Sequence, residues 1–205
     1  MADQVDVDYQ ALAKIVSQFS QQASQIQQMY QRVNSQTTSL ANGGWKGRGS
    51  DAFFREMQEL VLPGVKRLKE ALEEASRVSK QVSDGGRSLQ PVPGLIIPTP
   101  HVKEITMTDI IKMDYAKMES MVRTFRQGSQ QLQDTTQQMR TVAKTLENGA
   151  LLGRGGDAFV NSINSKLIPA ITRLNEKFEE LAKDVQKAMD DMKRADEYSK
   201  QQFND

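Results

Sequence analysis

The sequence of 205 residues matches itself at a fixed offset, and this duplication limits the possible folds more than any other feature. A shift of 106 positions aligns identical residues without a gap: Asp8-Tyr9 with Asp114-Tyr115, Gly47-Arg48-Gly49 with Gly153-Arg154-Gly155, Asp51-Ala52-Phe53 with Asp157-Ala158-Phe159, and Pro63 with Pro169. A self-match of this kind indicates a repeated structural unit. The chain is therefore predicted to be two related units rather than one large domain.

A proline-rich segment separates the two units. Four of the six prolines lie between Gln90 and Pro100, where they deny backbone donors and stop helices. We therefore expect a first unit at residues 1–89, an extended linker at residues 90–105 and a second unit at residues 106–205.

Apolar residues recur at steps of three and four in both units, a spacing that predicts two long amphipathic helices in each. Gly-rich turns at Asn42-Gly43-Gly44 and Asn148-Gly149 separate the helices. The expected seam of the first unit is Leu12, Ile15, Val16, Phe19, Ala23, Ile26, Tyr30, Val33 and Leu40, then Phe53, Met57, Val61, Val65, Leu68, Leu72, Ala75, Val78 and Val82. That of the second is Met118, Val122, Phe125, Leu132, Met139, Val142 and Leu146, then Phe159, Ile163, Leu167, Ile171, Leu174, Phe178, Leu181, Val185, Ala188 and Met192.

One hairpin alone would leave much of its seam, the line of apolar side chains along each helix, exposed to water. Docking two hairpins buries both seams, and at about 25 cal/mol per Å² this contributes several kcal/mol or more. The predicted fold is all-α: two helical hairpins related by duplication, packed as an elongated four-helix bundle. Pro63 and Pro169 fall inside the second helix of each hairpin, where we expect a shared kink; a break with a short turn is the alternative.

Composition excludes several classes of function. The chain has 27 Lys and Arg against 26 Asp and Glu, which disfavours binding to the phosphates of nucleic acid. It has no cysteine, and its one histidine, His101, stands alone in the linker, so we expect no enzyme activity, metal or cofactor. No apolar run approaches the ~20 residues of a membrane span, and the acidic, polar start is unlike a cleaved signal peptide.

The turn of the first hairpin carries Trp45-Lys46-Gly47, followed by Ser50-Asp51-Ala52-Phe53 at the start of the next helix. A hairpin of about 100 residues with Trp-X-Gly in its turn resembles the WXG family of early-secreted-antigen type, the substrates of type VII secretion. The second turn has Leu151-Leu152-Gly153, a degenerate form without the aromatic residue. The whole chain outside the linker is thus similar to a tandem WXG protein in which a dimer is fused into one polypeptide.

The resemblance points to recognition residues at the turns and at the C-terminal tail: Trp45, Gly47, Arg48, Leu151, Gly153, Arg154, Tyr198 and Gln202. Trp45 has two interpretations, ordinary packing at the bundle end or one wall of a cleft that faces the tail near Tyr198. Arg48 and Arg154 either pair with carboxylates or lie in solvent. Because only one turn has the tryptophan, we expect one end alone to be a complete site.

In this family the export signal is usually Tyr-X-X-X-Asp/Glu after the second helix. Tyr198 is followed at the fourth position by Gln202, so the motif here lacks its carboxylate, although Asp196, Glu197 and Asp205 lie nearby. Tyr115 and Glu119 match the pattern literally but open a helix, which is the wrong context.

The resemblance implies a non-enzymatic, leaderless substrate or export partner of a bacterial type VII (ESX-like) system. The expected partners are its membrane ATPase or other WXG-like and effector proteins, with no nucleic acid and no stable membrane insertion. The expected location is secreted or at the cell surface by a route independent of a signal peptide. The alternative is a cytoplasmic adaptor or scaffold that binds a helical effector.

Overall fold

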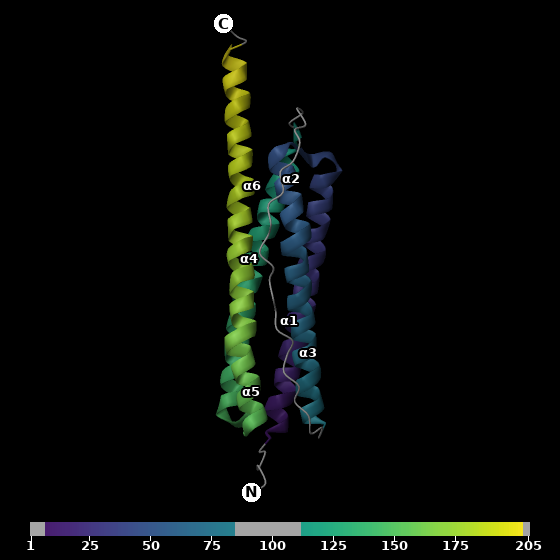
Figure 1. The fold of residues 1–205 in the computed structure, drawn as a ribbon, viewed down its shortest axis with the longest axis vertical. Helices are drawn as coiled ribbons and strands as arrows, with labels where there is room; N and C mark the ends of the chain where they lie inside the picture. Colours follow the sequence, from purple (N-terminus) through teal and green to yellow (C-terminus); the bar gives the residue numbers. More distant parts are fainter. Residues whose placement is uncertain (1–6, 85–111, 203–205) are drawn as a thin grey trace.

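A computed structural model describes residues 7–84 and 112–202 as an elongated bundle of long helices (Figure 1). The proline-rich linker predicted at residues 90–105, including His101, lies outside the described residues. Each described stretch forms one hairpin, in which two helical arms run antiparallel.

The first hairpin begins where Asp8 caps a helix: its carboxylate accepts hydrogen bonds from the backbone N–H groups of Gln10 and Ala11, both at 3.0 Å. Such a cap satisfies donors that a helix N-terminus leaves free. The elements of this hairpin are α1 (Tyr9–Ser39), the turn η1 (Leu40–Gly44), β1 (Trp45–Lys46), α2 (Arg48–Glu56), η2 (Met57–Val61) and α3 (Leu62–Ser83).

The second hairpin repeats these elements at the same 106-residue offset. Its elements are β2 (Lys112–Met113), α4 (Tyr115–Thr145), the turn η3 (Leu146–Ala150), α5 (Arg154–Ser162), η4 (Ile163–Leu167) and α6 (Ile168–Gln202). Every helix start matches its counterpart in the first hairpin, and Asp114 caps α4 as Asp8 caps α1. The duplication seen in the sequence therefore extends to the backbone.

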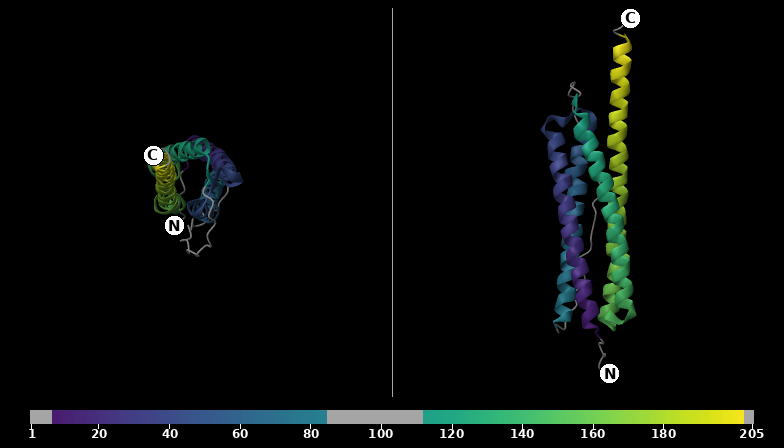
Figure 2. Two further views of the ribbon diagram at one scale, coloured as in Figure 1. Left: turned by 90° about the horizontal axis from the view of Figure 1, so that it is seen from above. Right: turned by 180° about the vertical axis from the view of Figure 1, so that it is seen from behind.

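The two hairpins share one core. Around the bundle the helices follow the order α3, α1, α4, α6, with α1 and α4 forming the main contact between hairpins (Figure 2). Phe19, Phe125 and Phe178 are fully buried in this core. Nearly all predicted seam residues are buried, and only Val16, Tyr30, Ala188 and Met192 are half-buried. The prediction of two hairpins in a four-helix bundle is confirmed.

The contacts between the hairpins are reciprocal. Trp45 pairs with Met113 in a short antiparallel ladder, and the equivalent pair, Val7 with Leu151, forms a bridge at the opposite end. The Asp8 N–H donates to the carbonyl of Ala150 at 3.2 Å, and the Asp114 N–H donates to the carbonyl of Gly44. Each contact becomes the other when the hairpins are exchanged, which is the property of a two-fold interface between subunits.

Aromatic rings repeat this symmetry inside the core. Phe19 of α1 packs on Phe159 of α5 with ring centroids 6.0 Å apart. Phe53 of α2 packs on Phe125 of α4 at 6.1 Å. Both pairs join one hairpin to the other, so each start of a second arm is fixed by the first arm of its neighbour.

The two prolines do not break their helices, and the alternative of a short turn is wrong. A π-helical turn, η2 or η4, precedes each proline; Leu62 N–H bonds to the carbonyl of Met57 and Ile168 N–H to that of Ile163, five residues back. A proline ring clashes with the carbonyl four residues before it. The wider turn moves that carbonyl aside, and the helix continues through Pro63 and Pro169.

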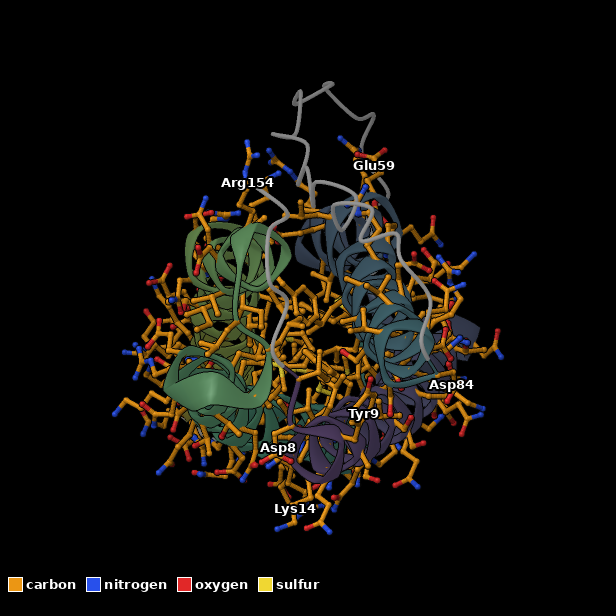
Figure 3. All side chains as sticks on the ribbon, turned by 90° about the horizontal axis from the view of Figure 1, so that it is seen from below. Asp8, Tyr9, Lys14, Glu59, Asp84 and Arg154 are labelled. Atoms are coloured by element: carbon orange, nitrogen blue, oxygen red, sulfur yellow. The ribbon has the colours of Figure 1, made fainter. Side chains whose placement is uncertain are left out.

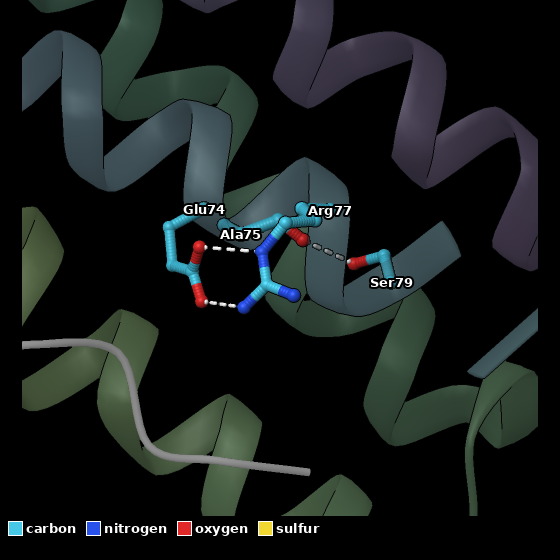
Figure 4. A network of polar contacts seen from close by, with 4 residues as sticks. All are labelled: Glu74, Ala75, Arg77 and Ser79. Atoms are coloured by element: carbon cyan, nitrogen blue, oxygen red, sulfur yellow. Dashed lines mark hydrogen bonds and ion pairs between the residues drawn. The ribbon is translucent and has the colours of Figure 1, made fainter. Parts of the chain in front are cut away.

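Ion pairs lie on the outer faces of the helices. On α3, Arg77 donates two hydrogen bonds to Glu74, and the Ser79 hydroxyl bonds to the carbonyl of Ala75 at 2.8 Å (Figure 4). The hydrogen bonds from Arg77, ahead of its charge, lower the pKa of Glu74. Pairs this exposed contribute a few tenths of a kcal/mol at most, so the shared core supplies the stability.

The symmetry ends in α6. Ser83 is the last residue of α3, and its counterpart Met189 is the last buried residue of α6. From there α6 continues to Gln202, about 20 Å further, and its residues 190–201 are exposed except for the half-buried Met192. This extension projects past the bundle at the end where α2 begins (Figure 1).

Candidate recognition site at the Trp45 end

The turn between α1 and α2 depends on two glycines with positive φ. Gly43 has φ 95°, and Gly47, the residue before α2, has φ 125° with ψ 177°. Only glycine adopts the second conformation at little cost. Gly149 and Gly153 repeat these angles at the other turn, with φ 112° and 103°. The glycine of Trp-X-Gly is therefore required by the backbone itself in both turns.

The Trp45 indole packs against its own hairpin. Its exposed fraction is 7%. Its ring centroid lies 5.3 Å from that of Phe53 and 6.3 Å from that of Phe54. A Cβ added to Gly49 would lie 3.4 Å from the indole, so the ring rests on the first turn of α2. From Phe53 the aromatic contacts continue through Phe125 to Phe178, both in the second hairpin.

A pocket of about 330 Å³ lies beside Trp45. It is lined by Ala41, Trp45, Lys46, Gly47, Ser50, Asp51 and Phe54. Lys46 is exposed, Asp51 and Phe54 are half-buried, and the buried Ser50 hydroxyl donates to the Gly47 carbonyl at 2.6 Å. The pocket thus combines an aromatic wall with one cationic and one anionic side chain, a composition suited to an amphipathic peptide segment.

The turn between α4 and α5 differs locally from the first turn, although its glycines repeat the positive φ angles. A Cβ on Gly156 would lie 2.0 Å from the Leu151 carbonyl oxygen, whereas the equivalent position in the first turn holds Ser50. Leu151 is buried, and Leu152 is 44% exposed. The chain of the second turn therefore lies directly against the first turn of α5.

The two turn arginines are the first residues of their helices, and both are exposed. Figure 3 looks onto the end of the bundle that carries Arg154, together with Tyr9 and Asp84. Asp51 and Asp157 occupy the first turns of α2 and α5, where a carboxylate stabilises the positive end of the helix dipole.

The extended part of α6 is anchored to the Trp45 end through Tyr115. The Tyr115 hydroxyl donates to Asp196 Oδ2 at 2.9 Å, and Lys193 Nζ lies 5.4 Å from the centre of the same ring. Burial, together with the bond to the Asp196 carboxylate and its charge, raises the pKa of Tyr115. Two residues beyond Asp196, Tyr198 is 65% exposed. Gln202 ends α6, and its side chain lies outside the described part.

The structure brings some of the predicted residues together. A line of contacts runs from Trp45 through Met113 to the start of α4, where Tyr115 binds Asp196 beside Tyr198. Leu151, Gly153 and Arg154 lie at the opposite end of the bundle (Figure 3). The roles of Met113 and Tyr115 escaped prediction, although the duplicated Asp-Tyr pair marked the start of α4.

Two further findings limit the chemistry of the described residues. Within residues 7–84 and 112–202, no three potential ligands among His, Cys, Asp and Glu gather as a metal site would require. Over the same residues, each helix is too short or too polar to cross a membrane.

A family model described as proteins of 100 residues with WXG matches the chain twice, over residues 4–87 and 110–197. Comparisons with curated proteins and with solved structures gave no significant match. The two matched segments coincide with the two hairpins and together cover most of the sequence.

Proposed function

Because this chain belongs to the WXG100 family and holds two of its domains in tandem, we propose that a type VII secretion system exports it as one folded, already paired unit recognised at the Trp45 end. Proteins of this family are non-enzymatic helical substrates of type VII secretion. In this proposal, one polypeptide supplies the surface that two separate family members would otherwise form together.

One observation carries the choice of end. The helix α6 runs past its counterpart α3 and exposes residues 190–202 at the end where the Trp45 turn lies (Figure 1). An exposed helix and an aromatic pocket at the same end of the bundle offer a receptor two elements to bind. The opposite end has the turn but no described helical extension, and its turn has Leu151 in place of the tryptophan.

Trp45 acts in this proposal mainly by positioning. Its indole is buried, so a partner meets the pocket walls formed by Lys46, Asp51 and Phe54 and the exposed Tyr198 of the tail. Gln202 has no carboxylate, but two acidic residues precede Tyr198 in the same helix: Glu197, and Asp196, which accepts the hydrogen bond from Tyr115.

Export in the native bacterium tests the proposal. Deleting residues 196–205, or substituting Tyr198→Ala, should abolish appearance of the protein outside the cell while its helicity and unfolding midpoint stay near those of the wild type. The matched control is Tyr9→Ala, which removes a tyrosine of similar exposure at the opposite end and should leave export intact. Unchanged export of the Tyr198 variant would contradict the proposal.

The same strains separate the second candidate, an adaptor for a helical effector. Capture of the secretion ATPase from detergent-solubilised membranes, lost in the Tyr198 variant, supports recognition for export. Capture of one soluble helical protein, equally strong in wild type and in the variant, instead supports the adaptor.

A further inference from the structure

The two hairpins meet through a buried polar pair at the contact of α1 and α4. Thr135 of α4 is fully buried, and its hydroxyl lies 2.7 Å from Gln22 Oε1 of α1 and 2.8 Å from the Gln131 carbonyl. Gln22 is only 6% exposed. A buried amide is costly unless it is paired, so this contact favours a partner that presents a hydroxyl at that position.

The equivalent place on the other side of the pseudo-two-fold axis has no polar pair. Gly128 replaces Gln22 there, and Met29 replaces Thr135. A Cβ on Gly128 would lie 2.4 Å from the Phe178 ring and 3.2 Å from the Met29 sulfur, so these two buried side chains fill the space that the glycine leaves. In the first hairpin the counterpart of Phe178 is the smaller Leu72.

Pairing of like hairpins would spoil both contacts. Two copies of the first hairpin would place Gln22 against Met29 twice, leaving two buried amides without partners. Two copies of the second would place Gly128 against Thr135 twice. The hydroxyl would keep only its bond to the Gln131 carbonyl, and the shorter threonine would leave the space of the Met29 side chain unfilled. Only the mixed pair satisfies the polar contact and fills the space over Gly128.

An ion pair adds to the same preference. Lys177 of α6 bonds to Glu56 of α2 in the other hairpin, and both side chains are largely buried, with exposed fractions of 21% and 27%. Their counterparts, Ala71 and Ser162, carry no charge. In a like pair, Glu56 would face Ala71 and lose this partner, while Lys177 would face Ser162 and keep only Glu180 of its own helix.

We propose that the contact faces of the two hairpins have become specific for each other, so that each hairpin binds the unlike hairpin and rejects a copy of itself. The face with Gln22 fits a partner that presents the hydroxyl of Thr135. The face with Gly128, which Phe178 covers in part, fits a partner that presents Met29. The inference is independent of export, since it concerns only the interface that holds the halves together.

The proposal is tested in the full chain by exchanging the contact residues at positions 22, 29 and 72 with their counterparts at positions 128, 135 and 178. Half exchange A (Q22G, M29T, L72F) makes the first hairpin like the second, and half exchange B (G128Q, T135M, F178L) does the reverse. Each should lower Tm by about 10 °C, or prevent folding, because each recreates a like pair. The sixfold exchange A plus B restores both contacts at swapped positions and should bring Tm to within about 3 °C of the wild type.

The sixfold variant decides the matter even when a half exchange does not fold. A loss close to the sum of A and B, or failure of the sixfold variant to fold, would overturn the proposal, and so would half exchanges that leave Tm unchanged. The matched control exchanges the exposed counterparts Ser17 and Arg123 (S17R, R123S), which should leave Tm within about 1 °C, singly or together.

Discussion

The two ends of this bundle share one backbone plan but differ in what they expose. At one end the Trp45 indole rests on Gly49 beside a pocket, and α6 runs past it carrying Tyr198. At the other end the Leu151 carbonyl presses on Gly156, and Leu152 and Tyr9 are exposed. The interhairpin contacts that fix the two turns are nevertheless the same, since both turns bond to the chain that precedes the neighbouring first helix.

The comparison separates the contacts that join the hairpins at both ends from the features present at one end alone. The reciprocal backbone contacts and the Phe19–Phe159 and Phe53–Phe125 pairs join the halves at both ends of the bundle. The backbone contacts themselves do not require an indole, because the Leu151 end forms the same contacts without one. One end of a symmetric framework can therefore specialise for recognition.

Truncating the two turn residues gives the largest expected effect. Trp45→Ala should lower the free energy of unfolding by about 3–5 kcal/mol, since it removes a buried ring from contact with Phe53 and Phe54. Leu151→Ala, a smaller deletion, should cost about 2–3 kcal/mol. Urea denaturation followed by circular dichroism measures both losses. A larger loss for Leu151→Ala than for Trp45→Ala would contradict the expectation that the indole contributes more to stability than the leucine.

Adding a methyl group at the first turn of α5 is expected to have the next effect. Gly156→Ala drives a Cβ toward the Leu151 carbonyl and should cost about 1–3 kcal/mol. The counterpart substitution, Ser50→Ala, removes only the hydroxyl that bonds to Gly47 and should cost about 1 kcal/mol. An unchanged free energy of unfolding for Gly156→Ala would contradict the close contact between Gly156 and the Leu151 carbonyl.

The ion pair between α6 and α2 exists on one side of the pseudo-axis only. Lys177→Met should cost about 1 kcal/mol at neutral pH. Burial alone would lower the pKa of Lys177, but the bonds to Glu180 and Glu56 and their charges outweigh it and raise the pKa. The stabilisation is therefore fully present below the unfolded pKa of about 10.4 and is lost as pH rises through the folded value.

That pH dependence has a simple check. The difference in unfolding free energy between wild type and the Lys177→Met variant should stay constant between pH 7 and 9 and shrink above about pH 10.4. A difference that grows in alkali would mean that burial outweighs the ion pairs and lowers the pKa of Lys177.

The smallest expected effect concerns the anchor of the extended helix. Tyr115→Phe removes the hydrogen bond to Asp196 on the protein surface and should change global stability by less than about 0.5 kcal/mol. Hydrogen exchange of residues 190–202 should nevertheless accelerate a few-fold. Tyr9→Phe, its counterpart, should leave exchange in this segment unchanged, and equal exchange in all three proteins would remove Tyr115 as an anchor.

Sequence reasoning predicted the architecture because duplication and the three-four spacing of apolar residues are direct consequences of helix packing. It also placed Trp45 at the same end as the tail. It did not predict the π-helical turns before Pro63 and Pro169, since proline signals only that an ordinary turn is strained. The bond between Tyr115 and Asp196 joins residues 81 positions apart, and no periodic pattern records such a pairing.

A designed disulfide tests most directly that one chain folds as a closed pair of reciprocal hairpins. Lys46 and Lys112 are paired across the short ladder between the hairpins, both are exposed, and the native chain has no cysteine. Facing residues of an antiparallel pair are close enough for a disulfide bond. The variant K46C/K112C should oxidise rapidly to a monomer with an internal bond that raises Tm. Thiols that stay reduced, or that join two chains, would contradict the account.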